Sequence, residues 1–356
     1  RVYERLSTGA MAALLDEAYV VFNNPLTRRA KLPMDFIHDN FVMTDSLMFG
    51  LEDTFWRNDN RLGENYSLVD TAFARDERIQ LLYSITAFEM FYASIGLSNG
   101  STLALAGNVE ETANWQVLQD DRGAHFAGVG NKGTVTKHME MMAGAGMVFA
   151  FGAGKKGIDS KAPFRAIDLV KVKDAIHLQG WFTQDKASAA ERALVATAFS
   201  GQNNRSTSKW RMGFNASLNF GVGEHMTLMA RGDYVHAVDS QLRRDHWNAE
   251  AALNIGLEDK LPLIISVMPF ARVGEALNNV GQRGPTMTAA SAGNDLTGAT
   301  IAAERLQITF GAVFGFHKSI DMSVEYVVNQ ESFEVPAGSP ATVDNDCFIL
   351  NLRVRW

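Results

Sequence analysis

Apolar and polar residues alternate one by one along much of the second half of the chain. From Trp210 to Val222 every even position is apolar, and every odd position holds a polar residue or glycine. Because side chains alternate between the two faces of a β-strand, this pattern predicts a strand with one apolar face. The same alternation recurs over 226–234, 247–257, 263–273, 306–316, 322–328 and 347–356, and short turns near Gly223, Asp259 and Lys318 join these segments into hairpins.

The links between the hairpins are of two kinds. The three turns just named are a few residues long, whereas the links at about 185–208, 276–302 and 331–344 are long and polar. Short turns at one end and long loops at the other are typical of outer-membrane β-barrels. A soluble β-sandwich also alternates, but its strands are usually shorter and its polar face would not mix Arg, Glu and Asn with glycine as a wet lumen does. The pattern favours the barrel.

The first half of the chain adds further strands. We expect them over 87–98, 101–108, 138–152 and 176–185, with another near 34–43. The whole chain therefore predicts an all-β fold, a transmembrane antiparallel β-barrel of about 14 strands, within a range of 12–16. Residues 47–82 look more helical than extended, and we expect a long, partly helical loop there, as a cap over one mouth of the barrel.

The last predicted strand has one apolar face and one basic face. Phe348, Leu350 and Leu352 alternate with positions that include Arg353 and Arg355. The apolar face would touch lipid, and the strand must pair with the first one because an open edge is not tolerated in a membrane. The terminal Trp356 resembles the signal by which outer-membrane barrels are read by the insertion machinery. Aromatic residues near other strand ends, at positions 210, 234, 247 and 316, suit an interfacial girdle.

Composition narrows the class of protein further. Of 356 residues, 46% are hydrophobic and 21% are charged, which excludes a largely disordered chain. The net charge of −7 gives no basic footprint for nucleic acid, and the single cysteine, Cys347, excludes an internal disulfide or a Cys-rich zinc site. No apolar run is long enough for a transmembrane helix. Numbering from Arg1 fits an exported protein whose signal peptide has been removed.

Residues 1–33 do not alternate. A short apolar helix over Ala10 to Leu15 could follow a cap at Ser7 or Thr8, before a turn at the sequence NNP. A helical apolar segment ahead of the first strand fits best inside the barrel, so we expect residues 1–33 to form a plug and residues 34–356 to form the barrel.

The same segment holds small residues from Gly9 to Ala13, the acidic pair Asp16 and Glu17, the aromatic Phe22, and Asn24 with Pro25. In these residues it resembles the start of the FadL group of long-chain fatty-acid transporters and the related PorV-like barrels of secretion systems. Leu26 and Thr27 depart from the family's Ala-Gly. The resemblance implies a fourteen-stranded barrel with an N-terminal hatch, which hydrophobic ligands enter from outside and leave by a kink or opening in the wall. The alternative is that NNP is simply a turn before the first strand.

Two sets of residues are candidates for a site. The resemblance and the basic last strand suggest a ligand pocket lined by Met11, Leu14, Leu15, Tyr19, Phe22, Arg353 and Arg355, with Asn24 and Pro25 as the plug motif. The alternation also places Arg211, Arg231, Asp233, Glu250, Arg272, Asp321, Glu325, Arg353 and Arg355 on the inward face. Because positive and negative side chains are mixed on this face, we expect them to form ion pairs between neighbouring strands. The alternative is a basic strip that binds the carboxylate of a ligand such as a fatty acid.

We therefore expect a barrel in the outer membrane of a Gram-negative-type bacterium that takes up a fatty-acid-like hydrophobic molecule. The alternative is a structural or secretion-associated barrel that anchors protein partners through its loops. A general porin fits less well, because a plug would obstruct diffusion. No enzyme is expected, because the sequence has neither GxSxG nor HExxH, and neither a cofactor nor a metal is predicted. The expected partners are outer-membrane lipid, a hydrophobic small-molecule ligand and proteins bound at the loops, and no nucleic acid is expected.

Overall fold

The computed structural model describes a chain made almost entirely of β-strands. It covers residues 2–7, 10–15, 18–23, 25–26, 43–53, 55–56, 62, 67–69, 73, 77–88, 90–99, 103–105, 118–120, 139–151, 174–189, 192, 206–257, 263–280, 304–317, 320–332, 342–344 and 346–354. Among these residues no helix is long and apolar enough to cross a membrane.

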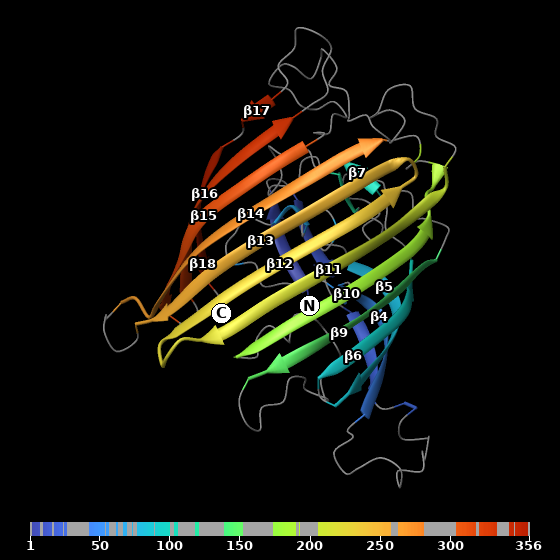
Figure 1. The fold of residues 1–356 in the computed structure, drawn as a ribbon, viewed down its shortest axis with the longest axis horizontal. Coiled ribbons are helices and arrows are strands. Elements are labelled where there is room, and N and C mark those ends of the chain that lie inside the picture. The colour runs from blue at the N-terminus through green and yellow to red at the C-terminus, as the bar shows by residue number, and fades with distance from the viewer. Residues whose placement is uncertain are drawn as a thin grey trace.

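One large antiparallel sheet contains most of the strands (Figure 1). Its order runs from β3 (Ala18–Asn23) through β4 (Met43–Asp53), β5 (Glu77–Ala87), β6 (Phe91–Ser98), β9 (Glu140–Ala150), β10 (Ala175–Lys186), β11 (Ser208–Gly221), β12 (Met226–Asp239), β13 (Leu242–Gly256), β14 (Ser266–Val280) and β15 (Glu304–His317) to β16 (Ile320–Ser332). Both β17 (Thr342–Asp344) and β18 (Cys347–Val354) pair with β16, at its two ends, so together they form the last strand position of the sheet. Two small hairpins, β1 (Val2–Ser7) with β2 (Ala10–Leu15) and β7 (Leu103–Leu105) with β8 (Leu118–Asp120), stand apart from it.

The predicted strands of the second half are confirmed. Every alternating segment from Trp210 onward coincides with one strand of the sheet, with boundaries shifted by a few residues. The predictions at 87–98, 138–152 and 176–185 are also strands, β6, β9 and β10. Only β7 occupies the predicted strand at 101–108, and the one near 34–43 lies outside the described residues apart from Met43, where β4 begins.

The partly helical loop predicted over 47–82 is wrong over much of that range, because β4 and β5 occupy both of its ends. In β5 the outward Ile79 and Leu81 alternate with the buried Gln80, Leu82 and Ser84. The apolar Leu82 breaks the alternation because it faces an apolar cluster on the inner side of the sheet. Between β4 and β5, the described helical positions are Leu68 and Val69 in α-helix and Phe73 in a π-helical turn.

The helix predicted over Ala10 to Leu15 is also wrong, since these residues form β2, paired with β1 from Val2↔Leu15 to Ser7↔Ala10. A paired strand satisfies the backbone groups as a helix would, and tertiary pairing overrides the helix propensity of Ala and Leu. β3, which follows, pairs with β4, so the sheet begins at Ala18 rather than near residue 34. That residues 1–17 block the lumen stays a prediction.

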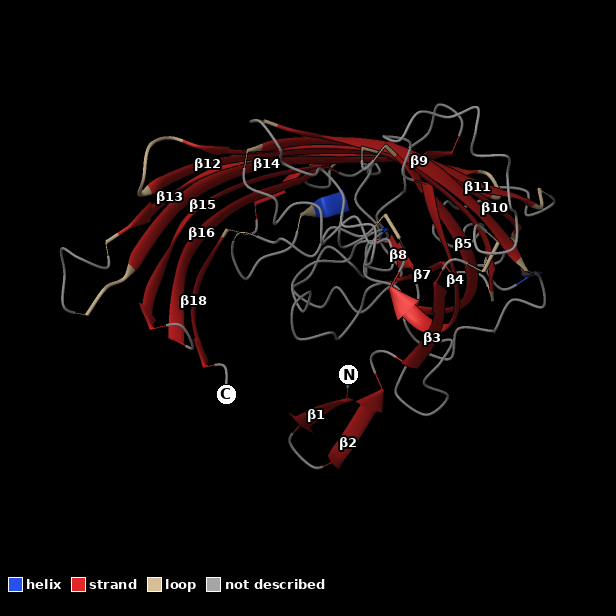
Figure 2. Cartoon of the chain, turned by 90° about the horizontal axis from the view of Figure 1, so that it is seen from below, coloured by secondary structure: helices blue, strands red, loops and turns tan. Residues whose placement is uncertain are grey.

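The sheet is curled into an incomplete cylinder. Figure 2 shows β3 and β18 on either side of an opening, with β1 and β2 close to that opening. No pairing between β3 and β18 is seen among the described residues. Inside the curve lies a short helical segment, and the described residues Leu68 and Val69 of the link between β4 and β5 are helical.

The outward face of the sheet is apolar and exposed. Along β15 the outward residues are Leu306, Ile308, Phe310, Ala312, Phe314 and Phe316, and Phe348, Leu350, Leu352 and Val354 continue this face on β18. Ten residue steps from 306 to 316 at about 3.4 Å, tilted by about 40°, give an apolar band roughly 25 Å tall, the height that outer-membrane barrels present to lipid.

The inward face has the opposite character. It buries Arg211, Arg231, Arg244, Arg272 and Arg305, together with Asp233, Asp239, Glu250 and Glu325. A soluble sandwich would bury the apolar face and expose the charges. The inversion therefore excludes the sandwich and makes this sheet the wall of a transmembrane barrel, which places the protein in the outer membrane.

Candidate transport path

Charged side chains form a cross-strand ladder on the inward face of β12, β13 and β14. Arg231, Glu250 and Arg272 are direct neighbours in the strand register. Glu250 accepts from Arg272 Nε at 2.8 Å and lies 3.5 Å from Arg231 Nη1, and Arg231 Nε lies 2.6 Å from Asp233. Charge-assisted contacts of this length neutralise the side chains locally. The prediction that the inward charges pair across neighbouring strands is confirmed for these residues.

A second charged cluster surrounds Asp239, at the end of the sheet where a tight turn joins β12 to β13. Its carboxylate accepts from Arg211 Nη2 and Arg244 Nε, both at 3.0 Å, and Lys209 is its partner in the register with β11. All four side chains are buried. Ser240, directly after Asp239, has a φ of 62°, the left-handed conformation that a two-residue hairpin turn requires. The turn thus brings the Arg244 side chain back beside Asp239.

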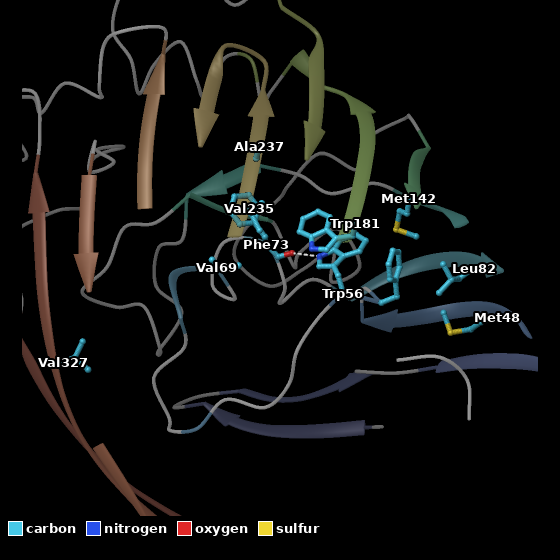
Figure 3. Packing of buried hydrophobic residues seen from close by; sticks show 11 residues of the cluster. Met48, Trp56, Val69, Phe73, Leu82, Met142, Trp181, Val235, Ala237 and Val327 are labelled. Carbon is cyan, nitrogen blue, oxygen red and sulfur yellow. Dashed lines mark hydrogen bonds between the residues drawn. The ribbon is translucent and has the colours of Figure 1, made fainter. Parts of the chain in front are cut away.

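The link between β4 and β5 contributes aromatic side chains to the inside of the wall. Its described residues Phe55, Trp56 and Phe73 are 4%, 2% and 1% exposed. The Trp56 ring stacks on Trp181 of β10, with centroids 4.5 Å apart and planes 11° apart. Figure 3 shows the rings of Trp56, Phe73 and Trp181 together with Val69 and Val235, so the link packs against the inner face of β10 and β12.

Phe73 lies against the Asp239 cluster. The Arg244 guanidinium sits over its ring at 4.4 Å, the Arg211 guanidinium lies at 5.9 Å, and the His246 ring meets it edge-to-face at 5.0 Å. The carbonyl oxygen of Phe73 accepts a hydrogen bond of 3.3 Å from Trp56 Nε1 (Figure 3). The two ends of the link are therefore tied to each other and to the wall.

Two glycines make room for this packing. A Cβ at Gly144 of β9 would lie 2.4 Å from the Phe55 ring, and one at Gly213 of β11 would lie 2.3 Å from the Trp181 ring. Real Cβ atoms do not approach a ring so closely, so both aromatic side chains lie flat on the wall only because these positions lack side chains.

The residues predicted to form a ligand pocket are spread over three elements. Met11, Leu14 and Leu15 are in β2. Tyr19 and Phe22 are in β3, where Tyr19 is partly buried against the inner cluster and Phe22 is 55% exposed. Arg353 faces inward on β18 at 3.9 Å from Asp321, and Pro25 lies in the turn after β3. Asn24 and Arg355 lie outside the described residues. The ligand-binding role of all these residues stays a prediction.

Sequence reasoning missed the residues that the structure brings together. Trp56, Phe73 and Trp181 come from segments far from Asp239 and Arg244 in the chain, and none of the five had an assigned role beyond general strand pattern. One signal was available: the sequence VDSQL, at 238–242, lies between two alternating segments and holds the turn that sets Arg244 beside Asp239.

Comparison with known proteins gives similar architectures only. No family model matches the sequence, and no curated protein matches it. Among solved structures, the outer-membrane channel DcaP of Acinetobacter baumannii is similar over 88% of this chain and 73% of its own, with 10% identity and a TM-score of 0.46. OprB of Pseudomonas putida is similar over 88% of this chain and 71% of its own, with 10% identity and a TM-score of 0.49. The outer-membrane protein OmpT of Vibrio cholerae is similar over 90% of this chain and 86% of its own, with 12% identity and a TM-score of 0.40. Because these TM-scores are below 0.5, the likenesses say nothing about what this chain transports.

Proposed function

We propose that this barrel is an outer-membrane channel for small polar molecules, whose lumen is narrowed by the link between β4 and β5. The observation that carries the proposal is the inward face itself. Most of the buried side chains of β10 to β16 on that face are charged or amide-bearing, from Gln179 to Asn329. Such a face favours water and polar solutes over hydrocarbon.

The link supplies the second element of the proposal. An unobstructed barrel of this size would pass solutes with little discrimination, whereas Trp56 and Phe73 bring bulky side chains onto the inner wall beside two arginines. A narrow passage with fixed charges on one side selects solutes by size and charge. The argument against a porin is that a plug would obstruct diffusion. Residues 10–15 are a strand rather than the expected helix, and whether they obstruct the lumen stays a prediction.

Uptake of a fatty-acid-like molecule, implied by the resemblance to the FadL group, is the second candidate. The apolar cluster around Trp56, Trp181 and Phe73 favours it, since a hydrocarbon chain could follow such a surface. Against it, the described residues of that cluster are packed on one another, and Phe22 of the predicted pocket faces outward. The scaffold role, through protein partners at the loops, is a third candidate that the described residues do not favour.

Liposome swelling separates these functions. The purified barrel is reconstituted in vesicles, and swelling is recorded with isotonic sugars and amino acids of increasing mass, beside a titration with a fluorescent fatty acid. We expect swelling that falls steeply with solute size and no saturable binding of the fatty acid. Saturable binding without swelling would replace the proposal by the second candidate. Neither activity, with a stoichiometric protein partner retained through purification, would replace it by the scaffold.

A further inference from the structure

One register row on the inward face consists mainly of side-chain amides. From β10 to β16, each member is the direct partner of the next, and the members in order are Gln179, Asn215, Asp233, Asn248, Gly274, Gln307 and Asn329. Apart from Asp233 and Gly274, all of them carry a carboxamide, and all of those amides are buried. Because neighbouring strands lie about 4.8 Å apart, these side chains form a continuous amide row across the wall.

Charged neighbours fix the orientation of two of these amides. Asn248 Nδ2 donates to the carboxylate of Asp233 at 2.9 Å, so its Oδ1 is directed elsewhere. Asn329 Oδ1 accepts from Arg305 Nε at 2.7 Å, so its Nδ2 is directed elsewhere. An ionised carboxylate cannot donate and a guanidinium cannot accept, so these partners determine which amide atom is the oxygen and which is the nitrogen.

The remaining atom of each of these two amides has no hydrogen bond. Asn248 Oδ1, an acceptor, and Asn329 Nδ2, a donor, are both buried without a partner, in residues that are 2% and 0% exposed. A buried polar atom without a partner is costly, and folded proteins leave few of them. Between the two amides, Gly274 places no side chain in the row. A bound molecule with both donor and acceptor groups would supply the missing hydrogen bonds.

The two atoms indicate the chemistry of that molecule. Asn248 Oδ1 needs a donor and Asn329 Nδ2 needs an acceptor. A hydroxyl group is both, whereas a carboxylate only accepts and an ammonium group only donates. Three strand spacings, about 14 Å between backbones, separate the two ends, so one hydroxyl group cannot serve both. A chain or ring system with several hydroxyl groups can.

We propose that the part of the amide row from Asn248 to Asn329 binds uncharged solutes rich in hydroxyl groups, of about the size of a disaccharide. The proposal rests on the proposed channel function and names the solutes that the channel prefers. The solute donates to Asn248 Oδ1, accepts from Asn329 Nδ2 and lies across Gly274.

Binding is measured on the folded barrel by saturation-transfer NMR, which detects weak binding and does not require conduction. The barrel is kept in a detergent without a sugar headgroup, so that the detergent does not compete. The probes are maltose, glucose and gluconate. Glucose is too short to reach both ends of the site, and gluconate is similar to glucose in size but carries a charge.

Two variants remove one contact each. Asn329→Asp keeps the shape and the acceptor for Arg305 but replaces the donor, and Asn248→Ser keeps a donor for Asp233 but withdraws the amide oxygen. Asn219→Asp is the matched control, because it makes the same exchange at a buried inward position of β11 outside the row.

We expect saturable binding of maltose to the wild type, weaker binding of glucose and the weakest binding of gluconate. Each of Asn329→Asp and Asn248→Ser should weaken maltose binding about fivefold, the effect of one lost hydrogen bond, and Asn219→Asp should leave it unchanged.

Absence of saturable maltose binding in the wild type would overturn the proposal and would mean that ordered water serves these amides. Gluconate binding as tight as that of glucose would also overturn it, as would maltose binding that Asn329→Asp leaves unchanged. If a variant does not fold, as judged by heat-modifiable electrophoretic mobility, the comparison of the three probes on the wild type still decides. A barrel that passes sugars without saturable binding would overturn this inference alone, and one that binds maltose but passes nothing would overturn the channel alone.

Discussion

Replacing Glu250 by Leu removes the carboxylate that bridges two buried arginines in the inward ladder. Arg272 donates to it at 2.8 Å, and Arg231 lies 3.5 Å away. Breaking a buried pair on one side typically costs 3–5 kcal/mol, because a charge remains without its counter-ion. Arg231 keeps Asp233 at 2.6 Å, so most of the loss falls on Arg272, and we expect the low end, about 3 kcal/mol.

The assay is the free energy of unfolding of the barrel in guanidinium chloride from lipid vesicles, read by tryptophan fluorescence. The double variant Glu250→Leu with Arg272→Leu should be more stable than Glu250→Leu alone, because the desolvated charge is removed with its partner. Asp321→Leu is the control. Its partner Arg353 lies 3.9 Å away with a side chain 38% exposed, so the expected loss is below about 1 kcal/mol.

A loss below about 1 kcal/mol for Glu250→Leu would refute the reasoning. It would mean that water in the lumen solvates Arg272 well enough to replace Glu250, so that the ladder is a solvated surface rather than a buried network.

Three further predictions concern the wall. Gly213→Leu should push Trp181 off the wall and change tryptophan fluorescence and solute permeation together, and an unchanged spectrum would contradict the close approach of 2.3 Å. Phe310→Arg puts a charge on the lipid-facing band and should cost about 2–4 kcal/mol in the same unfolding assay, with a loss below 1 kcal/mol placing residue 310 outside the bilayer. Tyr92→Phe removes the buried 2.8 Å hydrogen bond to His177 and should cost about 1–2 kcal/mol, whereas no loss would show that water replaces the hydroxyl.

The fold of the second half could be predicted from the sequence because two solvents act on its strands. Residues that face lipid, such as Phe310 and Leu350, are apolar, and residues that face the polar interior, such as Gln307 and Arg272, are polar or charged. Apolar and polar positions therefore alternate almost strictly along these strands. This physical contrast also predicted which charges face inward and that they pair, as Arg231 and Glu250 do.

The first half was harder because its inner side is not uniformly polar. Leu82 and Met142 face an apolar cluster rather than water, which blurs the alternation of β5 and β9. The cluster exists because the link after β4 folds inward, and no local pattern announces where such a link packs. The contact between Phe73 and Arg244 joins residues about 170 positions apart through this inward-folded link, and sequence periodicity does not encode it.

Single-channel conductance tests the central claim most directly, that the barrel is a polar channel narrowed by the link between β4 and β5. The wild type and the double variant Trp56→Ala with Phe73→Ala are compared in planar bilayers, with Phe348→Ala on the lipid-facing side as control. We predict discrete openings in the wild type and a conductance at least about twofold larger in the double variant, since ion flow rises with the open cross-section. A silent wild-type barrel, or a conductance that the two substitutions leave unchanged, would contradict the account.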